Sequence, residues 1–197
     1  MMYNYVYDEL DRINRLLRQG AAERITDTEF VEREVNRFLN CQERKVMLDG
    51  VRYFTGVQDI LSKKRTGIGK DGEIDELPNL PNHRIVDNQY RKAVLQKVNY
   101  LLGKPFTVES DDSNYTNNLN YIFDKKFRKI IKNVAKDCLN CGIGWLYVHY
   151  DENGELAFKR IEPWKVIPGW VDADHTELDY AIVTYDVIYY EGKTTEK

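Results

Sequence analysis

The sequence has few cysteines, few histidines and no long apolar run. Its 197 residues include three cysteines and three histidines, which is too few for a disulfide scaffold, so a reducing compartment such as the cytoplasm is expected. No apolar stretch approaches the roughly 20 residues that a membrane-spanning helix needs, and the polar N-terminus does not resemble a signal peptide. Neither a membrane protein nor a disulfide-rich protein is therefore expected.

An excess of positive charge is also lacking. Lys and Arg number 29 against 32 Asp and Glu, which gives a net charge of −3. Proteins dedicated to nucleic-acid binding are usually basic, so we do not expect one here, although a protein through which DNA merely passes is not excluded. With 42% hydrophobic and 31% charged residues, the composition indicates a globular chain that can bury a core.

No arrangement of residues points to catalysis. The segment 67–70 (GIGK) lacks the spacing and the flanking strand and helix of a phosphate-binding loop. Ser62, Ser110 and Ser113 have no histidine at a spacing typical of a catalytic base. The acidic residues around His175 lack the EF-hand spacing, and an exposed acidic loop is expected there. We therefore predict no enzyme, no cofactor and no metal site.

Cys138 and Cys141 form a CxxC pair, which could be half of a zinc site or a redox pair. Cys41 and the histidines do not supply further ligands at paired spacing. The pair closes a helical segment, where the helix dipole opposes a thiolate, and both sulfurs fall on the apolar stripe of that helix. We expect buried core cysteines, with a metal or redox protein as an alternative.

Apolar residues at three- and four-residue spacing predict helices over the first 140 residues. Thr26 and Glu29 form a capping box at one helix start. Gly103, followed by Pro105, ends another helix and is expected to adopt a positive φ. The predicted helices cover about residues 5–19, 26–48, 83–102 with Asn82 as cap, 113–122, and 124–141 with Gly142 as its end.

Beyond Gly142 the apolar period becomes two, which predicts strands. Asn153-Gly154 between two such runs is a strong hairpin signal. Helices first and strands later indicate an α+β class, with N-terminal helices followed by a small, mainly antiparallel sheet. The predicted strands cover residues 144–150, 155–161, 164–167 and 181–190, with a short additional strand at 106–108.

Residues 63–79 interrupt both patterns. They are basic and glycine-rich and contain few apolar residues, so an exposed, mobile loop is expected. The candidate residues for contact with DNA phosphates or a partner are the basic ones, namely Lys63, Lys64, Arg65 and Lys70.

Four stretches together carry a resemblance to a known family. They are residues 53–61 (YFTGVQDIL), 80–85 (LPNHRI), 98–106 (VNYLLGKPF) and 141–168, and their order and spacing are more specific than any one of them. They resemble the portal, or head-to-tail connector, proteins of siphophages and of prophages of Gram-positive hosts. The third stretch is similar to that family's helix ending in Tyr-Leu-x-Gly-x-Pro.

The resemblance implies a structural role and a set of partners. Portal proteins typically form dodecameric rings at one capsid vertex, so the implied partners are further copies of the chain, a scaffolding protein, the terminase large subunit, a head-tail adaptor and double-stranded DNA that passes without sequence preference. The implied role serves head assembly, DNA packaging and ejection, and head-tail connection. The implied location is the virion and, during assembly, the host cytoplasm.

The resemblance also implies a domain organisation. Residues 1–25 are expected to form an N-terminal helical extension, and residues 26–197 a wing-like α+β domain that includes the loop 63–79. Because family members are longer, the stem and clip regions are expected to follow, and the chain is expected to be a fragment. Two alternatives stay open: an independent module that binds a partner or nucleic acid, and an inactive truncated prophage remnant.

Overall fold

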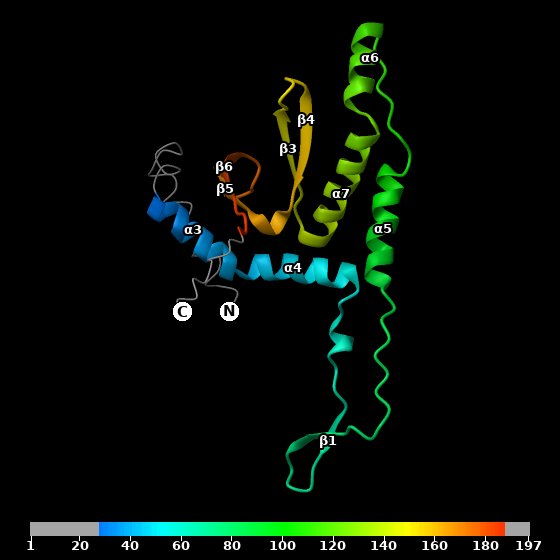
Figure 1. Cartoon of the computed structure of the whole chain (residues 1–197), viewed down its shortest axis with the longest axis vertical. Coiled ribbons are helices and arrows are strands. Elements are labelled where there is room, and N and C mark those ends of the chain that lie inside the picture. The colour runs from blue at the N-terminus through cyan, green and yellow to red at the C-terminus, as the bar shows by residue number, and fades with distance from the viewer. Residues whose placement is uncertain (1–27, 188–197) are drawn as a thin grey trace, which may run out of the picture. The chain divides into compact units, whose positions relative to one another are not determined.

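The computed structural model describes residues 28–187 (Figure 1). The predicted helix at 5–19, the extension 1–25 and residue Thr26 lie outside the described residues. In the described part, helices come first and most strands follow, which confirms the α+β class. The helices are α3 (Thr28–Asn40), α4 (Gln42–Thr55), α5 (Gln89–Leu102), α6 (Ser113–Ile122) and α7 (Lys125–Cys141). The strands are β1 (Thr66–Ile68), β2 (Ile74–Glu76), β3 (Trp145–Tyr150), β4 (Leu156–Ile161), β5 (Val166–Trp170) and β6 (Leu178–Val183).

The described strands pair as three separate antiparallel hairpin-like sheets, where the sequence led us to expect one small sheet. In β3–β4 the pairing runs from Trp145 opposite Ile161 to Tyr150 opposite Leu156. The turn between them contains Gly154 at φ +76°, which confirms the hairpin predicted at Asn153-Gly154. In β5–β6 the strand continues through Pro168, where the sequence predicted that it would end.

Two compact units divide the described chain. One comprises residues 28–44 with 164–187, and the other comprises residues 45–163. In the first unit, helix α3 packs on β5, and the ring of Phe30 meets the edge of Tyr180 with centroids 6.0 Å apart. Both rings are buried, as are Val166 and Ile167 of β5. A Cβ at Gly169 would overlap the ring of Tyr180, so this position requires glycine.

Helix α7 lies at the centre of the second unit, with α5 and the β3–β4 pair against it. Asp124 caps it by accepting a hydrogen bond from the backbone N–H of Phe127 at 2.8 Å, and Gly142 ends it at φ +80°, as predicted. The buried ring of Phe127 lies against Phe158 of β4, with centroids 4.6 Å apart. Aromatic burial of this kind contributes roughly 1.5–3 kcal/mol per side chain.

An ion pair joins α7 to β4. The side chain of Asp137 is buried, and it accepts two hydrogen bonds from Arg160, one of them from Nη2 to Oδ1 at 2.7 Å. The hydrogen bonds that Arg160 donates to the Asp137 carboxylate raise the pKa of Arg160. A buried carboxylate is costly unless it is paired and hydrogen-bonded, so the position of β4 on α7 follows from this pair.

The predicted helix at 26–48 is two helices, with a break at Cys41 and an end at Thr55. The backbone N–H of Cys41 donates to the carbonyl of Phe38 at 3.2 Å, which tightens the last turn of α3. The Cys41 sulfur then accepts from the N–H of Arg44 at 3.4 Å. A thiol that caps the second helix therefore marks the break, and the sequence pattern did not show it.

The predicted helix 83–102 starts later than expected, at Gln89. Its cap is Asn88, whose side-chain oxygen accepts from the N–H of Arg91 at 2.9 Å, and not Asn82. Residues 106–108 form no strand. Instead, the ring of Phe106 packs against Phe123, with centroids 5.5 Å apart.

The prediction of a positive φ at Gly103 is wrong. Its backbone is right-handed, with φ −66° and ψ −41°. A Cβ there would overlap the carbonyl oxygen of Asn99. Glycine is required by this close approach and not by a left-handed turn.

Gly50 provides a test of how α4 packs on α7. A Cβ at this position would overlap the backbone carbonyl of Asn140. On an exposed helix, Gly→Ala usually stabilises by roughly 0.5–1 kcal/mol. Here we expect Gly50→Ala to destabilise by about 1–3 kcal/mol, the usual cost of overpacking. Urea unfolding measures the change in the free energy of unfolding. The control is Lys45→Ala at an exposed position of the same helix, which we expect to change that free energy by less than about 0.5 kcal/mol. An increase in stability for Gly50→Ala would contradict the contact.

Candidate interaction arm

Residues 57–88 leave the end of α4 and return to the start of α5 as one projecting segment, the arm (Figure 1). Its tip, residues 66–76, is the β1–β2 pair, in which Ile68 lies opposite Ile74. The first leg is residues 57–65 and the second leg is residues 77–88. The predicted exposure of 63–79 is confirmed, but the segment contains a paired hairpin, which the sequence did not indicate.

Hydrogen bonds join the two legs along their length. Asn82 Nδ2 donates to the carbonyl of Lys63 at 2.8 Å, and Arg84 Nη1 donates to that of Leu61 at 3.1 Å. Nearer the tip, the first leg also donates to the second, because Arg65 Nη1 reaches the carbonyl of Pro81 at 2.9 Å. Side chains from both legs therefore satisfy backbone carbonyls of the other leg and hold the legs side by side.

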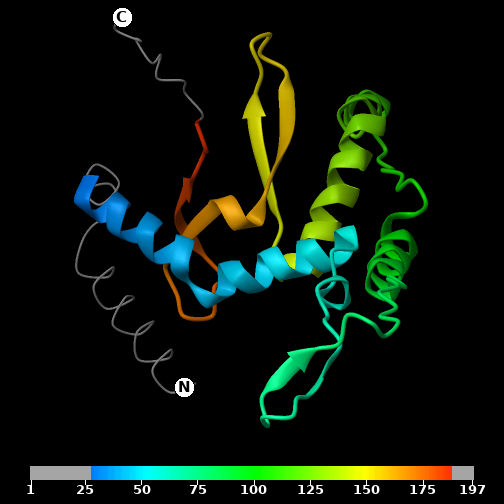
Figure 2. The same ribbon diagram turned by 60° about the horizontal axis from the view of Figure 1, so that its bottom comes forward.

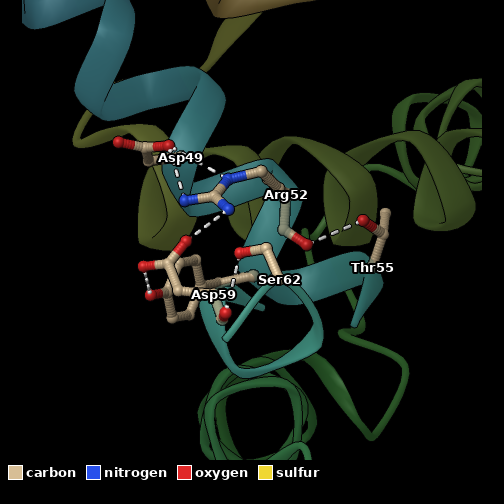
Figure 3. Close-up of polar contacts among 6 residues, drawn as sticks. Asp49, Arg52, Thr55, Asp59 and Ser62 are labelled. Atoms are coloured by element: carbon tan, nitrogen blue, oxygen red, sulfur yellow. Dashed lines mark hydrogen bonds and ion pairs between the residues drawn. The ribbon is translucent and has the colours of Figure 1, made fainter. Parts of the chain in front are cut away.

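A polar cluster, the anchor, fixes the first leg to α4 and consists of Arg52, Tyr53 and Asp59 (Figure 3). Arg52 Nη1 donates to Asp59 Oδ1 at 2.6 Å, and Tyr53 Oη donates to Asp59 Oδ2 at 2.5 Å. Arg52 Nε also donates to Asp49 at 3.1 Å. The Tyr53 hydroxyl and then the Arg52 guanidinium lower the pKa of Asp59. The Asp59 carboxylate in turn raises the pKa of both partners.

Asn88 closes the base of the arm from the second leg. Its Nδ2 donates to the carbonyls of Tyr53 at 2.9 Å and Phe54 at 3.2 Å, while its Oδ1 caps α5. Gly56, at φ +95°, forms the turn that lets the first leg depart beside it. One amide therefore connects the end of α4, the base of the arm and the start of α5.

The four predicted basic residues all lie on the arm and are exposed, but two of them serve the arm itself. Lys64 pairs with Glu76 of β2, and Arg65 donates to the second leg. Lys70 lies in the turn at the tip, separated from Lys63 by about 20 Å of extended chain. Lys63, Lys64 and Arg65 therefore lie in succession on the first leg, and Lys70 lies apart from them at the tip.

The CxxC pair is less buried than predicted. Cys138 is exposed and Cys141 is half-buried, so the expectation of two core cysteines is wrong for Cys138, whose side chain lies near the end of α7. Partial desolvation and the nearby Asp137 raise the pKa of both thiols, that of Cys141 to about 12. Neither environment favours a thiolate, as the position at a helix C-terminus led us to expect.

Residues 67–70 do not form a phosphate-binding loop, because they belong to β1 and the turn that follows it, with no helix after them.

In the acidic loop, Asp172 accepts hydrogen bonds from the backbone N–H groups of Thr176 and Glu177, both at 3.0 Å. The Thr176 hydroxyl and then these backbone hydrogen bonds lower the pKa of Asp172 to about 2, so Asp172 stabilises a turn. Within residues 28–187, no group of three or more potential metal ligands is found, and no helix has the length and apolarity to span a membrane.

A sequence model of the family described as "Phage portal protein, SPP1 Gp6-like" matches residues 40–197, which include α4, the whole arm, α5 and α7. The chain belongs to this portal protein family. The resemblance predicted from four stretches of sequence is confirmed, and all four lie inside the matched range.

Two relatives illustrate the relationship. The portal protein of Bacillus phage SPP1 is 25% identical over 190 residues, which cover 95% of this chain and 37% of the relative. The portal protein of Clostridium phage phiCD119 is 24% identical over 151 residues, which cover 72% of this chain and 33% of the relative. The chain spans about a third of the length of these curated portal proteins.

Sequence reasoning missed the residues that hold the arm. The pairing of Arg52 with Asp59 crosses a turn that helical or strand spacing does not reveal. Asn88 could have been predicted as a helix cap, because an Asn directly before a helical segment is a typical N-cap. Asn82 offered the same signal six residues earlier, and only the hydrogen bonds of the folded chain distinguish the two.

The anchor predicts an effect of Asp59 on the arm. Asp59→Asn removes the charge that Arg52 and Tyr53 contact, so amide hydrogen exchange in 57–88 should accelerate several-fold while α7 is unchanged. Asp49→Asn, which touches only Arg52, is the matched control. Since the pKa of Asp59 is lowered, the anchor contributes stability above the unfolded-state value of about 4 and loses it as the pH falls through the lower folded value. Equal exchange in the two variants would contradict the anchor.

Proposed function

We propose that this chain is the wing portion of a portal subunit, a structural component of a ring at the capsid vertex. The observation that carries the proposal is the family match over residues 40–197. The proposed roles are those of the whole assembly: nucleation of the head, DNA packaging and ejection, and head-tail connection. The proposed partners are other copies of the chain, scaffolding protein, terminase large subunit, head-tail adaptor and passing DNA. No catalytic step is proposed.

The burial pattern of the unit 45–163 supports a role in an assembly. Only five residues of this unit are buried, namely Val94, Val98, Phe127, Asp137 and Pro163. Large apolar side chains remain exposed on the arm and on α5. Where such groups form a contiguous patch, they are typical of surfaces that another protein covers.

An independent nucleic-acid-binding module has less support. Its candidate residues are the arm cations, and two of these, Lys64 and Arg65, contact other parts of the arm. The net charge of −3 also opposes DNA binding.

A genetic experiment tests the proposed function. In the phage or prophage that encodes the chain, a stop codon at Gln42 should abolish DNA-filled heads while capsid protein is still made. A copy of the gene supplied in trans should restore packaging, which excludes an effect on neighbouring genes, and a synonymous change at the same codon is the control. Electron microscopy of lysates distinguishes empty from filled heads. Normal numbers of filled heads would contradict the proposal.

A binding experiment tests the passive relation to DNA. We expect weak binding of duplex DNA without sequence preference, with dissociation constants of roughly 1–100 μM at physiological salt. At most four contacts from the arm cations give a salt slope of about −0.9 per contact. Fluorescence anisotropy at two salt concentrations measures this, with Lys63→Gln and Lys70→Gln compared with the exposed Lys125→Gln and Lys126→Gln. Sequence-selective binding at nanomolar strength would favour the independent module.

A further inference from the structure

The tip of the arm exposes two large apolar side chains that nothing else in its unit covers. Ile68 and Ile74 are 85% and 76% exposed, and their opposite positions in the β1–β2 register place them on one face of the pair. A two-stranded hairpin is marginally stable alone in water. A paired isoleucine surface at the end of a projecting arm is therefore suited to contact with another surface.

Helix α5 carries a second surface with exposed apolar side chains, like those at the tip of the arm. Val94 and Val98 of this helix are buried in the contact with α7. Tyr100 and Leu101, nearer the C-terminal end of the helix, are nevertheless 90% and 72% exposed. Helical spacing places Tyr100 and Leu101 on one flank of the helix, beside the buried valines, together with the other residues of what we call the α5 face, namely Ala93, Lys97 and Lys104.

The charges of the two surfaces are complementary. Residues 66–76 carry four carboxylates, of Asp71, Glu73, Asp75 and Glu76, against the single cation Lys70. Residues 89–104 carry four cations and no carboxylate. Acidic groups around an apolar tip and lysines around an apolar helix face favour one orientation of encounter.

The tip does not reach the α5 face of its own chain. The arm leaves from the first residues of α5, and it projects away from the far end of that helix in both views (Figures 1 and 2). Tyr100 lies twelve residues beyond Asn88, which is about 18 Å along the helix in the other direction. The matching surface must therefore belong to another molecule.

We propose that the tip of the arm docks on the α5 face of a second copy of this chain. The proposal rests on the proposed function, because a ring sets identical copies side by side. A contact in which one surface of a copy meets a different surface of the next is the kind that generates closed rings. The anchor and the hydrogen bonds between the legs hold the tip in position for this contact, and docking would cover Ile68 and Ile74.

Two singly substituted chains test the contact by disulfide formation. A chain with Ile74→Cys is mixed with a chain with Tyr100→Cys and oxidised, and mass spectrometry identifies the linked peptides. Because each chain carries only one new cysteine, a 74–100 disulfide forms only between molecules. Asp75→Cys, on the other face of the hairpin, and Asn99→Cys, on another side of α5, are the matched controls, and peptide mapping separates links through the native cysteines.

We expect 74–100 disulfides to exceed the control pairs by roughly tenfold, as the raised local concentration of docked groups requires. Sedimentation velocity on the parent chain separates the outcomes. A chain that associates but forms the control links equally well overturns the arm contact and leaves the ring intact. A chain that remains monomeric at roughly millimolar concentration and forms no 74–100 link contradicts both the arm contact and ring formation by this chain.

Reversal of charge provides a second test that does not depend on cysteine chemistry. Glu76→Lys, on the same face of the β1–β2 pair as Ile74, and Lys97→Glu on the α5 face should each weaken self-association, by about threefold for an exposed ion pair. The chain that carries both changes should recover most of the loss. Additive weakening in the double variant would show that these two residues do not meet, and would overturn the proposed orientation.

Discussion

The buried carboxylate of Asp137 constrains the unit formed by residues 45–163 more than any other group. Only 4% of this residue is exposed, and a charge so placed requires a partner. Arg160 supplies it from β4 with two hydrogen bonds. Since β3 follows α7 directly and pairs with β4 along its whole length, the ion pair sets the position of the hairpin as well as that of one strand.

The arm depends on the same helix, though less directly. Helix α4 approaches α7 at Gly50, where only a glycine fits beneath the Asn140 carbonyl. Helix α5 lies on α7 through Val94 and Val98. With both helices held against α7, the end of one and the start of the other lie close enough for Asn88 to connect them. The arm then projects from a fixed base, and the anchor of Arg52, Tyr53 and Asp59 sets the direction of its first leg.

The fold was predictable where local chemistry decides it. Asp124 and Gly142 mark the ends of α7 unambiguously, and Asn153-Gly154 specifies a hairpin whatever surrounds it. Prediction failed where contacts distant in sequence decide. Asn82 and Asn88 are equivalent as caps until the carbonyls of Tyr53 and Phe54 bind one of them. Gly103 has the sequence position of a left-handed end, yet its backbone stays right-handed beside the Asn99 carbonyl.

The candidate surface was harder to foresee than the family. The four stretches that resemble portal proteins could be recognised from their order, and the family match includes them all. The basic residues marked the arm as a candidate contact segment in the sequence. That Ile68 and Ile74 lie opposite each other could be determined only from the register of β1 and β2. Likewise, Cys138 has the helical spacing of a core residue, yet it is exposed.

A reconstruction by electron cryomicroscopy of the portal vertex, from particles of the phage that encodes this chain, tests the account most directly. We predict a ring in which the arm of each subunit extends to the next and ends with Ile68 and Ile74 against Tyr100 and Leu101 of that neighbour. A ring whose arms end in solvent would contradict the docking contact. A vertex that contains no copy of this chain would contradict the assignment of a portal role.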